Sequence, residues 1–226
     1  MSKIAILTDS SCDIPQEMAE KYNIDIMSFH ILLDDVDYVE RESCSNEEFY
    51  AKMRAAKGVP STAAITPIQF CEKYCQYVDE GYTDVIHVPI NRSGSSTYNN
   101  AVMAQGMLRE ERPEHHLKIH LIDSHTYSMP FGWYLCEMAR KLQNGAEISH
   151  VIHEFESQMN KMEIVLGPYS LRQMKKSGRI SAAAAVMGEL MGIRPIITLI
   201  DGKTKVEAKV LSLIHISEPT RPLYIS

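Results

Sequence analysis

Up to about residue 165, short apolar segments alternate with segments that carry helix-start signals. Apolar runs that stop at a polar residue predict buried strands at 3–8, 84–88 and 117–122. Two capping-box patterns, Ser45-Asn-Glu-Glu48 and Thr66-Pro-Ile-Gln69, predict the starts of helices. Alternation of this kind favours a parallel sheet with helices on both of its faces.

The remaining elements of this region follow from the same signals. Asp13 is predicted to cap a helix that ends near Tyr22, and a strand is predicted near 25–30. Further helices are predicted at 97–112, 132–143 and 149–162, and a short strand at 163–166.

The pattern changes after residue 165. A strand is predicted at 195–200, and the Asp201-Gly202 pair that follows is a hairpin signal, which indicates antiparallel pairing. We therefore expect an α/β protein with an N-terminal domain over 1–165, in which helices flank a parallel sheet. A second, incomplete α/β domain with antiparallel pairing is expected over 166–210.

The last segment, Leu211 to Ser226, does not continue the strand pattern and has prolines at 219 and 222. It resembles the translated read-through of a sequencing adapter, so we expect it to be foreign and the chain to be truncated at its C-terminus. A chain that ends in this way is expected to be unstable and to bind lipid weakly.

Composition excludes several classes of protein. The formal net charge of −6 argues against a nucleic-acid partner, which needs a basic face. No apolar run is long enough for a signal peptide or a membrane span, so we expect a cytoplasmic location without stable membrane insertion. Cys71 and Cys75 suit one helix face and are interpreted as reduced core thiols, and no metal or cofactor is predicted.

Small polar residues follow three of the predicted strands. Asp9-Ser10, Asn91–Thr97 and Asp123-Ser124 come at strand ends, where open α/β sheets bind ligands. Ser95 and Ser96 stand at a predicted helix start, which favours an anion, and Gly94 allows a tight turn. A hydroxyl at Thr62 is placed to donate to the same anion from the other side.

Signs of catalysis are weak. The chain lacks GxSxG, HExxH and the lysine of a P-loop, so it is not predicted to be a complete enzyme. The alternative that stays open is a phosphotransferase-type enzyme acting on a small anionic substrate.

Taken in order, several segments resemble signatures of the DegV family of bacterial fatty-acid-binding proteins. The similar segments span about residues 1–210, and they are Lys3–Pro15, Ser61–Pro67, Ser95–Tyr98, Ile122–Ser124, Ser177–Ser181 and Ile193–Ile197. Ala63 and Ser96 depart from the family pattern, which has serine and glycine there, whereas Thr62 and Ser95 keep it.

The resemblance implies a two-domain protein that buries one long-chain fatty acid and holds its carboxylate by Thr62, Ser95 and Ser96. The family presents this carboxylate to a separate fatty acid kinase subunit, which makes an acyl phosphate for phospholipid metabolism. Supporting roles are expected for Asp9, Ser10, Asp123 and Ser124, and for Arg179, which faces either the anion, the kinase or an interdomain partner.

Overall fold

The structure is a computed structural model that describes residues 3–167, 194–200 and 203–210. The chain divides into two compact units, Met1–Met162 and Glu163–Ser226, and each is described by itself. The predicted boundary between 165 and 166 stays a prediction, because most of the chain that follows it lies outside the described residues.

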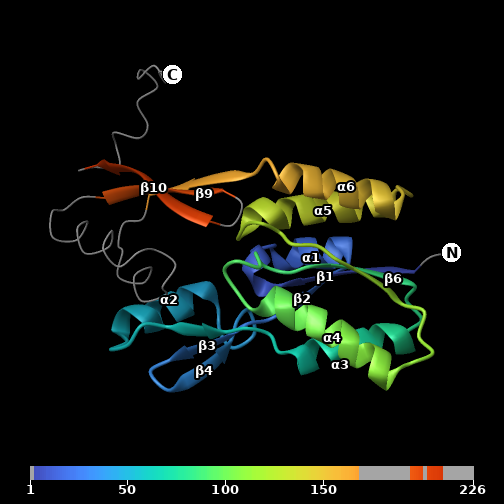
Figure 1. The fold of residues 1–226 in the computed structure, drawn as a ribbon. Coiled ribbons are helices and arrows are strands. Elements are labelled where there is room, and N and C mark those ends of the chain that lie inside the picture. The colour runs from blue at the N-terminus through green and yellow to red at the C-terminus, as the bar shows by residue number, and fades with distance from the viewer. Residues whose placement is uncertain (1–2, 168–193, 201–202, 211–226) are drawn as a thin grey trace, which may run out of the picture. The chain divides into compact units, whose positions relative to one another are not determined.

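A parallel sheet forms the centre of the first unit (Figure 1). Its strands lie in the order β2-β1-β6-β7, and every neighbouring pair is parallel. The bounds are β1 Ile4–Asp9, β2 Ile24–Met27, β6 Asp84–Val88 and β7 Lys118–Leu121. The predicted α/β fold with a parallel sheet is therefore confirmed.

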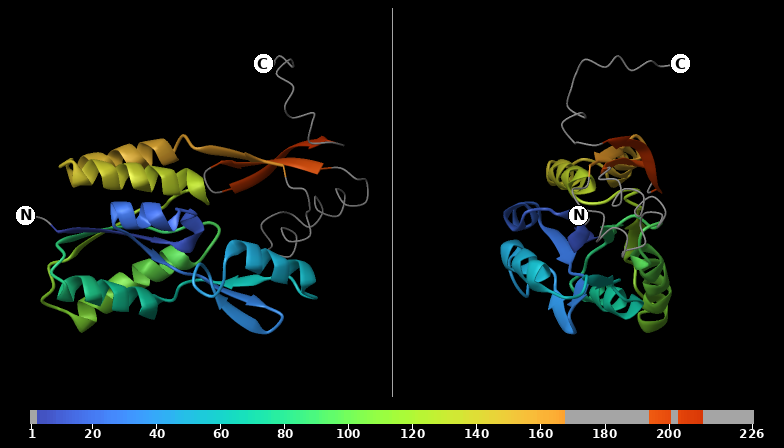
Figure 2. Two further views of the ribbon diagram at one scale, coloured as in Figure 1. Left: turned by 180° about the vertical axis from the view of Figure 1, so that it is seen from behind. Right: turned by 90° about the vertical axis from the view of Figure 1, so that its left-hand side faces the viewer.

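Successive residues of the central strands point to opposite faces of the sheet, and each face is covered by its own helices. Ile6 and Ile86 pack in the same core cluster as Phe131 and Leu135, whereas their neighbours belong to the other cluster. On this first face lie α1 Gln16–Tyr22, α5 Met129–Gln143 and α6 Ile148–Met159. Figures 1 and 2 show α5 and α6 stacked beyond α1.

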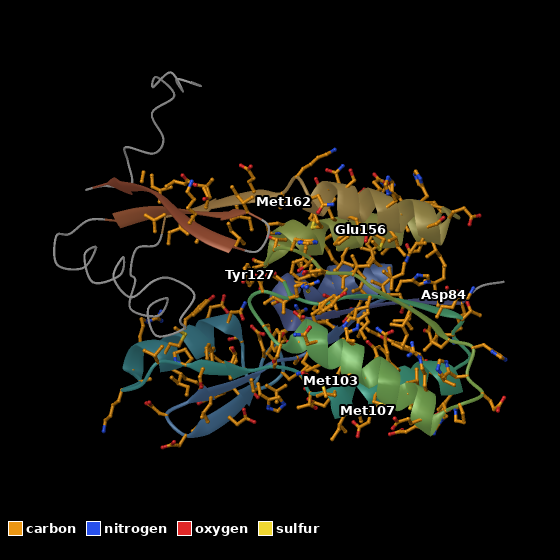
Figure 3. All side chains as sticks on the ribbon, viewed as in Figure 1. Asp84, Met103, Met107, Tyr127, Glu156 and Met162 are labelled. Atoms are coloured by element: carbon orange, nitrogen blue, oxygen red, sulfur yellow. The ribbon has the colours of Figure 1, made fainter. Side chains whose placement is uncertain are left out.

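The opposite face of the sheet is covered by α3 Pro67–Asp79 and α4 Thr97–Glu111. Leu7 and Val85 meet the buried aromatic rings of Phe70 and Tyr74 there. Each fully buried side chain of this size stabilises the fold by about 1.5–3 kcal/mol. On the outer side of α4, Met103 is 60% exposed (Figure 3).

Both capping boxes form as predicted. The Ser45 hydroxyl accepts from the Glu48 amide at 3.3 Å, and Glu48 accepts from the Ser45 amide at 2.8 Å, at the start of α2 Asn46–Ala55. Thr66 and Gln69 make the same pair of bonds before α3. Such caps contribute on the order of 1 kcal/mol each.

The prediction that Asp13 caps the first helix is wrong. Asp13 has a φ of 52° and ends the short 3-10 turn Ser10–Cys12, while Pro15 precedes α1. Its carboxylate accepts instead from the hydroxyl of Ser128. The side chain therefore ties the β1 end to the start of α5.

The strand predicted near 25–30 is present as β2, and a small antiparallel sheet that was not predicted follows it. Its order is β4-β3-β5, with β3 His30–Leu33, β4 Val36–Val39 and β5 Ser61–Ala63. Asp34 and Asp35, with φ of 48° and 64°, form the two-residue turn between β3 and β4. Positive φ at both positions is the geometry that matches the twist of a hairpin.

Gly132 lets α5 approach the β1 end closely. A Cβ atom at this position would lie 2.2 Å from the carbonyl oxygen of Cys12, which real contacts do not allow. Only glycine therefore lets the start of α5 pack against the turn that follows β1.

The second unit contains a three-stranded antiparallel sheet with β9 Arg194–Ile200 between β8 Glu163–Leu166 and β10 Lys203–Val210. The predicted antiparallel pairing is confirmed, whereas the Asp201-Gly202 turn itself lies outside the described residues. Ile197 and Leu199 are buried. Among the residues that the structure describes, no helix has the length and apolarity that crossing a bilayer requires.

Candidate functional site

The polar residues predicted at three strand ends are brought together by hydrogen bonds across the carboxyl edge of the sheet. Asp9 at the end of β1 accepts from the Ile90 amide at 2.7 Å, just after β6. Asp123, after β7, accepts from the Arg92 amide at 3.1 Å. The two carboxylates thus link the β6 loop to the loops on both sides of it.

Asp9 is an organiser of these loops. It is fully buried, and besides Ile90 it accepts from the amide and hydroxyl of Ser11. Burial raises the pKa of Asp9 to about 6, although these hydrogen bonds oppose the shift. Because donors already contact both carboxylate oxygens, Asp9 is poorly placed to take a proton from a substrate.

The hydroxyl groups of Ser10 and Ser124 already form hydrogen bonds with other groups of the protein. The Ser10 hydroxyl accepts from the Phe29 amide at 3.0 Å and donates to Glu40 at 2.5 Å. The Ser124 hydroxyl donates to the carbonyl oxygen of Thr126 at 3.1 Å. Both serines are buried, so they position loops and offer no exposed hydroxyl to a ligand.

Asp123 lies between the side chains of Arg92 and His125. Its Oδ2 atom is buried and has no hydrogen-bond partner among the described residues. Arg92 Nε and His125 Nδ1 lie 3.9 Å and 4.0 Å from it. From the sequence, Arg92 was included only as a member of the Asn91–Thr97 loop and His125 was not singled out, because neither is a serine, threonine or aspartate of the strand-end pattern.

The loop before α4 presents hydroxyl groups at the start of that helix. Ser95 is half-buried, and its Oγ accepts from the Thr97 amide at 3.2 Å and lies 2.8 Å from the Thr97 hydroxyl. Ser96 precedes the helix, makes no side-chain capping bond and is exposed. Exposed hydroxyls beside a helix N-terminus favour an anionic group.

Tyr127 supports this loop from the β7 side. Its hydroxyl accepts from Asn91 Nδ2 at 3.1 Å. A Cβ atom on Gly94 would lie 2.0 Å from the same hydroxyl oxygen, so Gly94 is required by a close approach. The expected tight turn is present, because the Gly94 amide donates to the Asn91 carbonyl oxygen at 3.0 Å. Gly94 has no positive φ, so the close approach of Tyr127 is what requires glycine here.

Thr62 lies on β5, exposed, in the segment that leads to α3. Asn100 of α4 donates from Nδ2 to the carbonyl oxygen of Ile65 at 2.7 Å. This bond ties the segment that carries Thr62 to the helix whose first turn follows Ser95 and Ser96.

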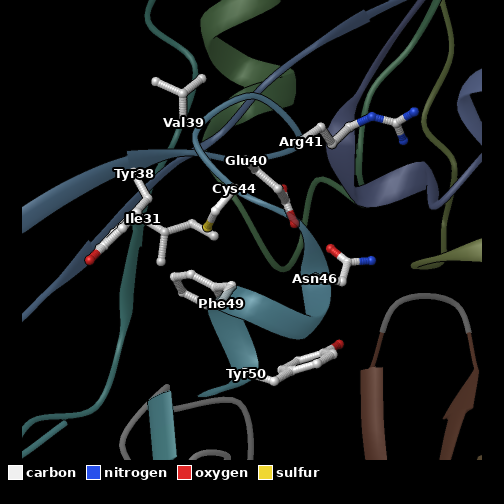
Figure 4. Close-up of a pocket in the computed structure, with 9 residues that line it drawn as sticks. All are labelled: Ile31, Tyr38, Val39, Glu40, Arg41, Cys44, Asn46, Phe49 and Tyr50. Carbon is white, nitrogen blue, oxygen red and sulfur yellow. The ribbon is translucent and has the colours of Figure 1, made fainter. Parts of the chain in front are cut away.

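A small pocket lies beside the sheet that carries Thr62 (Figure 4). In the strand register Ile31 pairs with Thr62 on one side and with Tyr38 on the other, so these three side chains share a sheet face. Ile31 and Tyr38 line the pocket together with Phe49, Tyr50 and Cys44.

The volume of this pocket is about 130 Å³. A cavity of about 150 Å³ takes a ligand the size of benzene, so this pocket has room for a short apolar segment only. Arg179, the remaining candidate residue, lies outside the described residues.

The fold and the strand-end loops define an α/β protein with a candidate anion site beyond the carboxyl edge of a parallel sheet. The model of the family described as "Uncharacterised protein, DegV family COG1307" matches residues 3–213. The chain belongs to the DegV family.

Relatives and solved structures agree with this assignment. A DegV domain-containing protein of Clostridium perfringens is 30% identical over 211 residues, which cover 93% of this chain and 73% of that protein. A fatty acid binding DegV family protein from Streptococcus agalactiae is 26% identical, with a TM-score of 0.82 over 96% of this chain and 75% of that one.

A third similar protein shows the fold alone, because its identity is 19%. It is the Fatty Acid Kinase (Fak) B3 protein of Streptococcus pneumoniae, solved with linoleic acid, with a TM-score of 0.76. The match covers 93% of this chain and 73% of that one.

Proposed function

We propose that this protein binds one long-chain fatty acid by its carboxylate, at Thr62, Ser95 and Ser96. The observation that carries the proposal is the Asn100–Ile65 bond, which ties the Thr62 segment to α4, behind the two serines. The Streptococcus agalactiae relative is described as fatty acid binding, which supports the ligand class.

The local chemistry suits a carboxylate better than a phosphoanhydride. Neutral hydroxyls and a helix start provide a few donors, and the loop has no lysine of the P-loop kind. Arg92 stands in the same loop, where its charge is shared with Asp123. The apolar Ile31 and Tyr38 share the sheet face of Thr62, so an acyl chain has apolar contacts beside its head group.

The second part of the proposal is that the protein is a carrier. It presents the bound carboxylate to a separate fatty acid kinase subunit, which forms the acyl phosphate with ATP. The support for this partner is what the resemblance to the DegV family implies, and the fold shared with the pneumococcal Fak B3 protein is consistent with it. Asp9, whose oxygens are held by amides and a hydroxyl, gives no support for catalysis by this chain.

The binding test is mass spectrometry of lipid extracted under denaturing conditions from the purified chain and its variants. Thr62→Ala, Ser95→Ala and Ser96→Ala each remove one hydroxyl donor to a charged acceptor, worth about 1.5–3 kcal/mol, which corresponds to roughly 10- to 150-fold in affinity. Ser149→Ala, an exposed serine of α6, is the matched control.

A chimera that continues with the C-terminal part of the Clostridium perfringens relative should be tested in parallel. Fatty acid that co-purifies with the parent chimera and Ser149→Ala, and falls in the three hydroxyl variants, supports the carboxylate site. Equal lipid in all variants would place the carboxylate elsewhere. Absence of lipid from every protein would reject a fatty acid as the ligand.

The carrier role is tested by adding a purified bacterial fatty acid kinase subunit and ATP to the loaded chimera. Acyl phosphate should form only when both proteins are present. Turnover of ATP and a small anionic substrate by the chain alone would instead support a phosphotransferase.

A further inference from the structure

Two buried thiols and one carboxylate meet between α3 and α4, away from the strand-end loops. Cys71 and Cys75 are one turn apart on α3, and Glu111 is the last residue of α4. One ligand atom from each of the three residues lies within 4.8 Å of the other two. The Cys75 thiol donates a hydrogen bond to Glu111, with 3.5 Å between Sγ and Oε2.

The position of Glu111 is unfavourable for a carboxylate without a cation. The carboxyl end of a helix carries partial negative charge, which favours cations and disfavours anions. The Glu111 residue is exposed, yet its carboxylate contacts the Cys75 thiol. A cation at this point would interact favourably with the carboxylate, with the thiolates and with the end of α4.

We propose that Cys71, Cys75 and Glu111 form a binding site for a thiophilic divalent cation of the Zn²⁺ type. In a tetrahedral zinc site the Zn–S and Zn–O distances are about 2.3 and 2.1 Å, which places sulfur and oxygen about 3.6 Å apart. The observed separation of 3.5 Å between Cys75 Sγ and Glu111 Oε2 matches this value.

The net charge of the bound state is small. Zn²⁺ displaces one proton from each thiol to solvent, and two thiolates, one carboxylate and the dication together carry one negative charge. The guanidinium of Arg112, the residue after Glu111, is nearby and pairs with Asp79 of α3 at 3.6 Å. Water is expected to fill the fourth position, and exposed Glu111 gives the ion a path from solvent.

The simpler interpretation is that Cys71 and Cys75 only fill space in the core, as expected from the sequence. Apolar packing explains the two buried thiols, and a thiol–carboxylate hydrogen bond explains the contact of Cys75 with Glu111. Neither requires that a ligand atom of Cys71 also lies within 4.8 Å of the other two. The two interpretations differ in one measurable property, because only a ligand set binds one metal ion per chain through sulfur.

The test is titration of the metal-stripped, reduced chain with Co²⁺, followed by competition with Zn²⁺. We expect one Co²⁺ per chain, with thiolate-to-metal charge-transfer absorption and the visible bands of tetrahedral cobalt, both removed by Zn²⁺. Cys75→Ala should abolish the charge-transfer signal of the pair. Glu111→Gln changes an exposed residue and should weaken Co²⁺ binding at least about tenfold.

Cys136→Ala is the matched control, because Cys136 is an equally buried thiol on α5. Its titration should equal that of the parent chain. Zn²⁺ should also raise the melting temperature of the parent and of Cys136→Ala, and of neither Cys75→Ala nor a Cys71→Ala variant. Cobalt spectra unchanged by Cys75→Ala and Glu111→Gln, or no charge-transfer absorption in the parent chain, would overturn the proposal.

Discussion

Gly94 and Tyr127 show how closely the loop before α4 is packed. The Tyr127 hydroxyl occupies the volume where a side chain at position 94 would begin. Since Asn91 donates to the same hydroxyl, the tyrosine joins both halves of the loop. The geometry of Ser95 and Ser96 therefore depends on the absence of a side chain at Gly94.

Replacement of Gly94 by alanine is expected to destabilise the fold by about 1–3 kcal/mol, the usual effect of overpacking. Urea denaturation measures this change. Gly106→Ala, in the middle of α4 with open space at its Cβ, should instead stabilise by about 0.5–1 kcal/mol.

A double variant separates the contact from a backbone effect. Tyr127→Ala removes the phenol ring, so Gly94→Ala should cost less in that background than in the parent chain. An equal cost in both backgrounds would show that the loop backbone, and not Tyr127, excludes a side chain.

The sequence predicted the tight turn at Gly94, which the structure contains, but not the contact that excludes a side chain there. The Ser and Asn neighbours of Gly94 indicate a turn, but the contact that excludes a side chain comes from Tyr127, 33 positions further along the chain. Close approaches between segments far apart in sequence leave no local pattern. For the same reason Arg92 and His125 were not singled out, because only their distance from Asp123 indicates a role for them.

At the scale of elements, the hairpin β3–β4 is held by Asp34. Its carboxylate accepts from the amides of Lys57 and Gly58 at 3.0 and 2.8 Å, and so connects the hairpin turn to the segment before β5. Asp34 therefore links all parts of the small sheet that positions Thr62.

The replacement Asp34→Ala should loosen this sheet. Loss of two bonds to a carboxylate is expected to cost about 1–2 kcal/mol on this exposed surface. Hydrogen exchange should show faster exchange of amides in β3 and β5, with little change in the central sheet.

Asp35→Ala provides the control, because Asp35 shares the positive φ of Asp34 and lies in the same turn. If both variants loosen the sheet equally, the cost comes from the left-handed backbone and not from the bonds to Lys57 and Gly58.

The elements with local signals were predictable. The capping boxes at Ser45 and Thr66 and the strand at 84–88 depend on residues adjacent in sequence, and the structure confirms them. The Asp34-Asp35 turn was missed because this pair is a weaker hairpin signal than Asn-Gly or Asp-Gly. Asp13 failed as a cap because its partner, Ser128, belongs to another element.

At the scale of the whole molecule, two buried titratable groups make stability depend on pH in opposite directions. Burial lowers the pKa of His87 from 6.5 to about 3, and burial raises the pKa of Asp9 from 3.8 to about 6. Between pH 6.5 and 3 the unfolded state binds a proton at His87 that the folded state does not, so acid destabilises the fold. At Asp9 the folded state keeps the proton between pH 3.8 and 6, so stability falls as pH rises through that window.

The variant His87→Asn isolates the histidine contribution. Asparagine does not titrate and keeps a polar partner for the Tyr74 hydroxyl, which lies 2.6 Å from His87 Nδ1. Acidification from pH 7 to 5 should cost the variant less stability than the parent, by on the order of 2 kcal/mol. Urea denaturation at both pH values checks this difference.

His150→Asn is the matched control, because His150 is exposed on α6. Its stability should follow the parent at both pH values. If His87→Asn also follows the parent, then His87 is charged in the folded state and the burial argument fails.

The strand register described for β5 has a consequence for insertions and deletions. Thr62 shares a sheet face with Ile31 and Tyr38 only while β5 keeps its pairing with β3, because a slip of one residue turns every side chain to the other face. A change of side chain at 59 or 60 is therefore expected to disturb the site less than the loss or gain of one residue there. The chain length between Gly58, which Asp34 holds, and Thr62 therefore sets which face of the sheet Thr62 occupies.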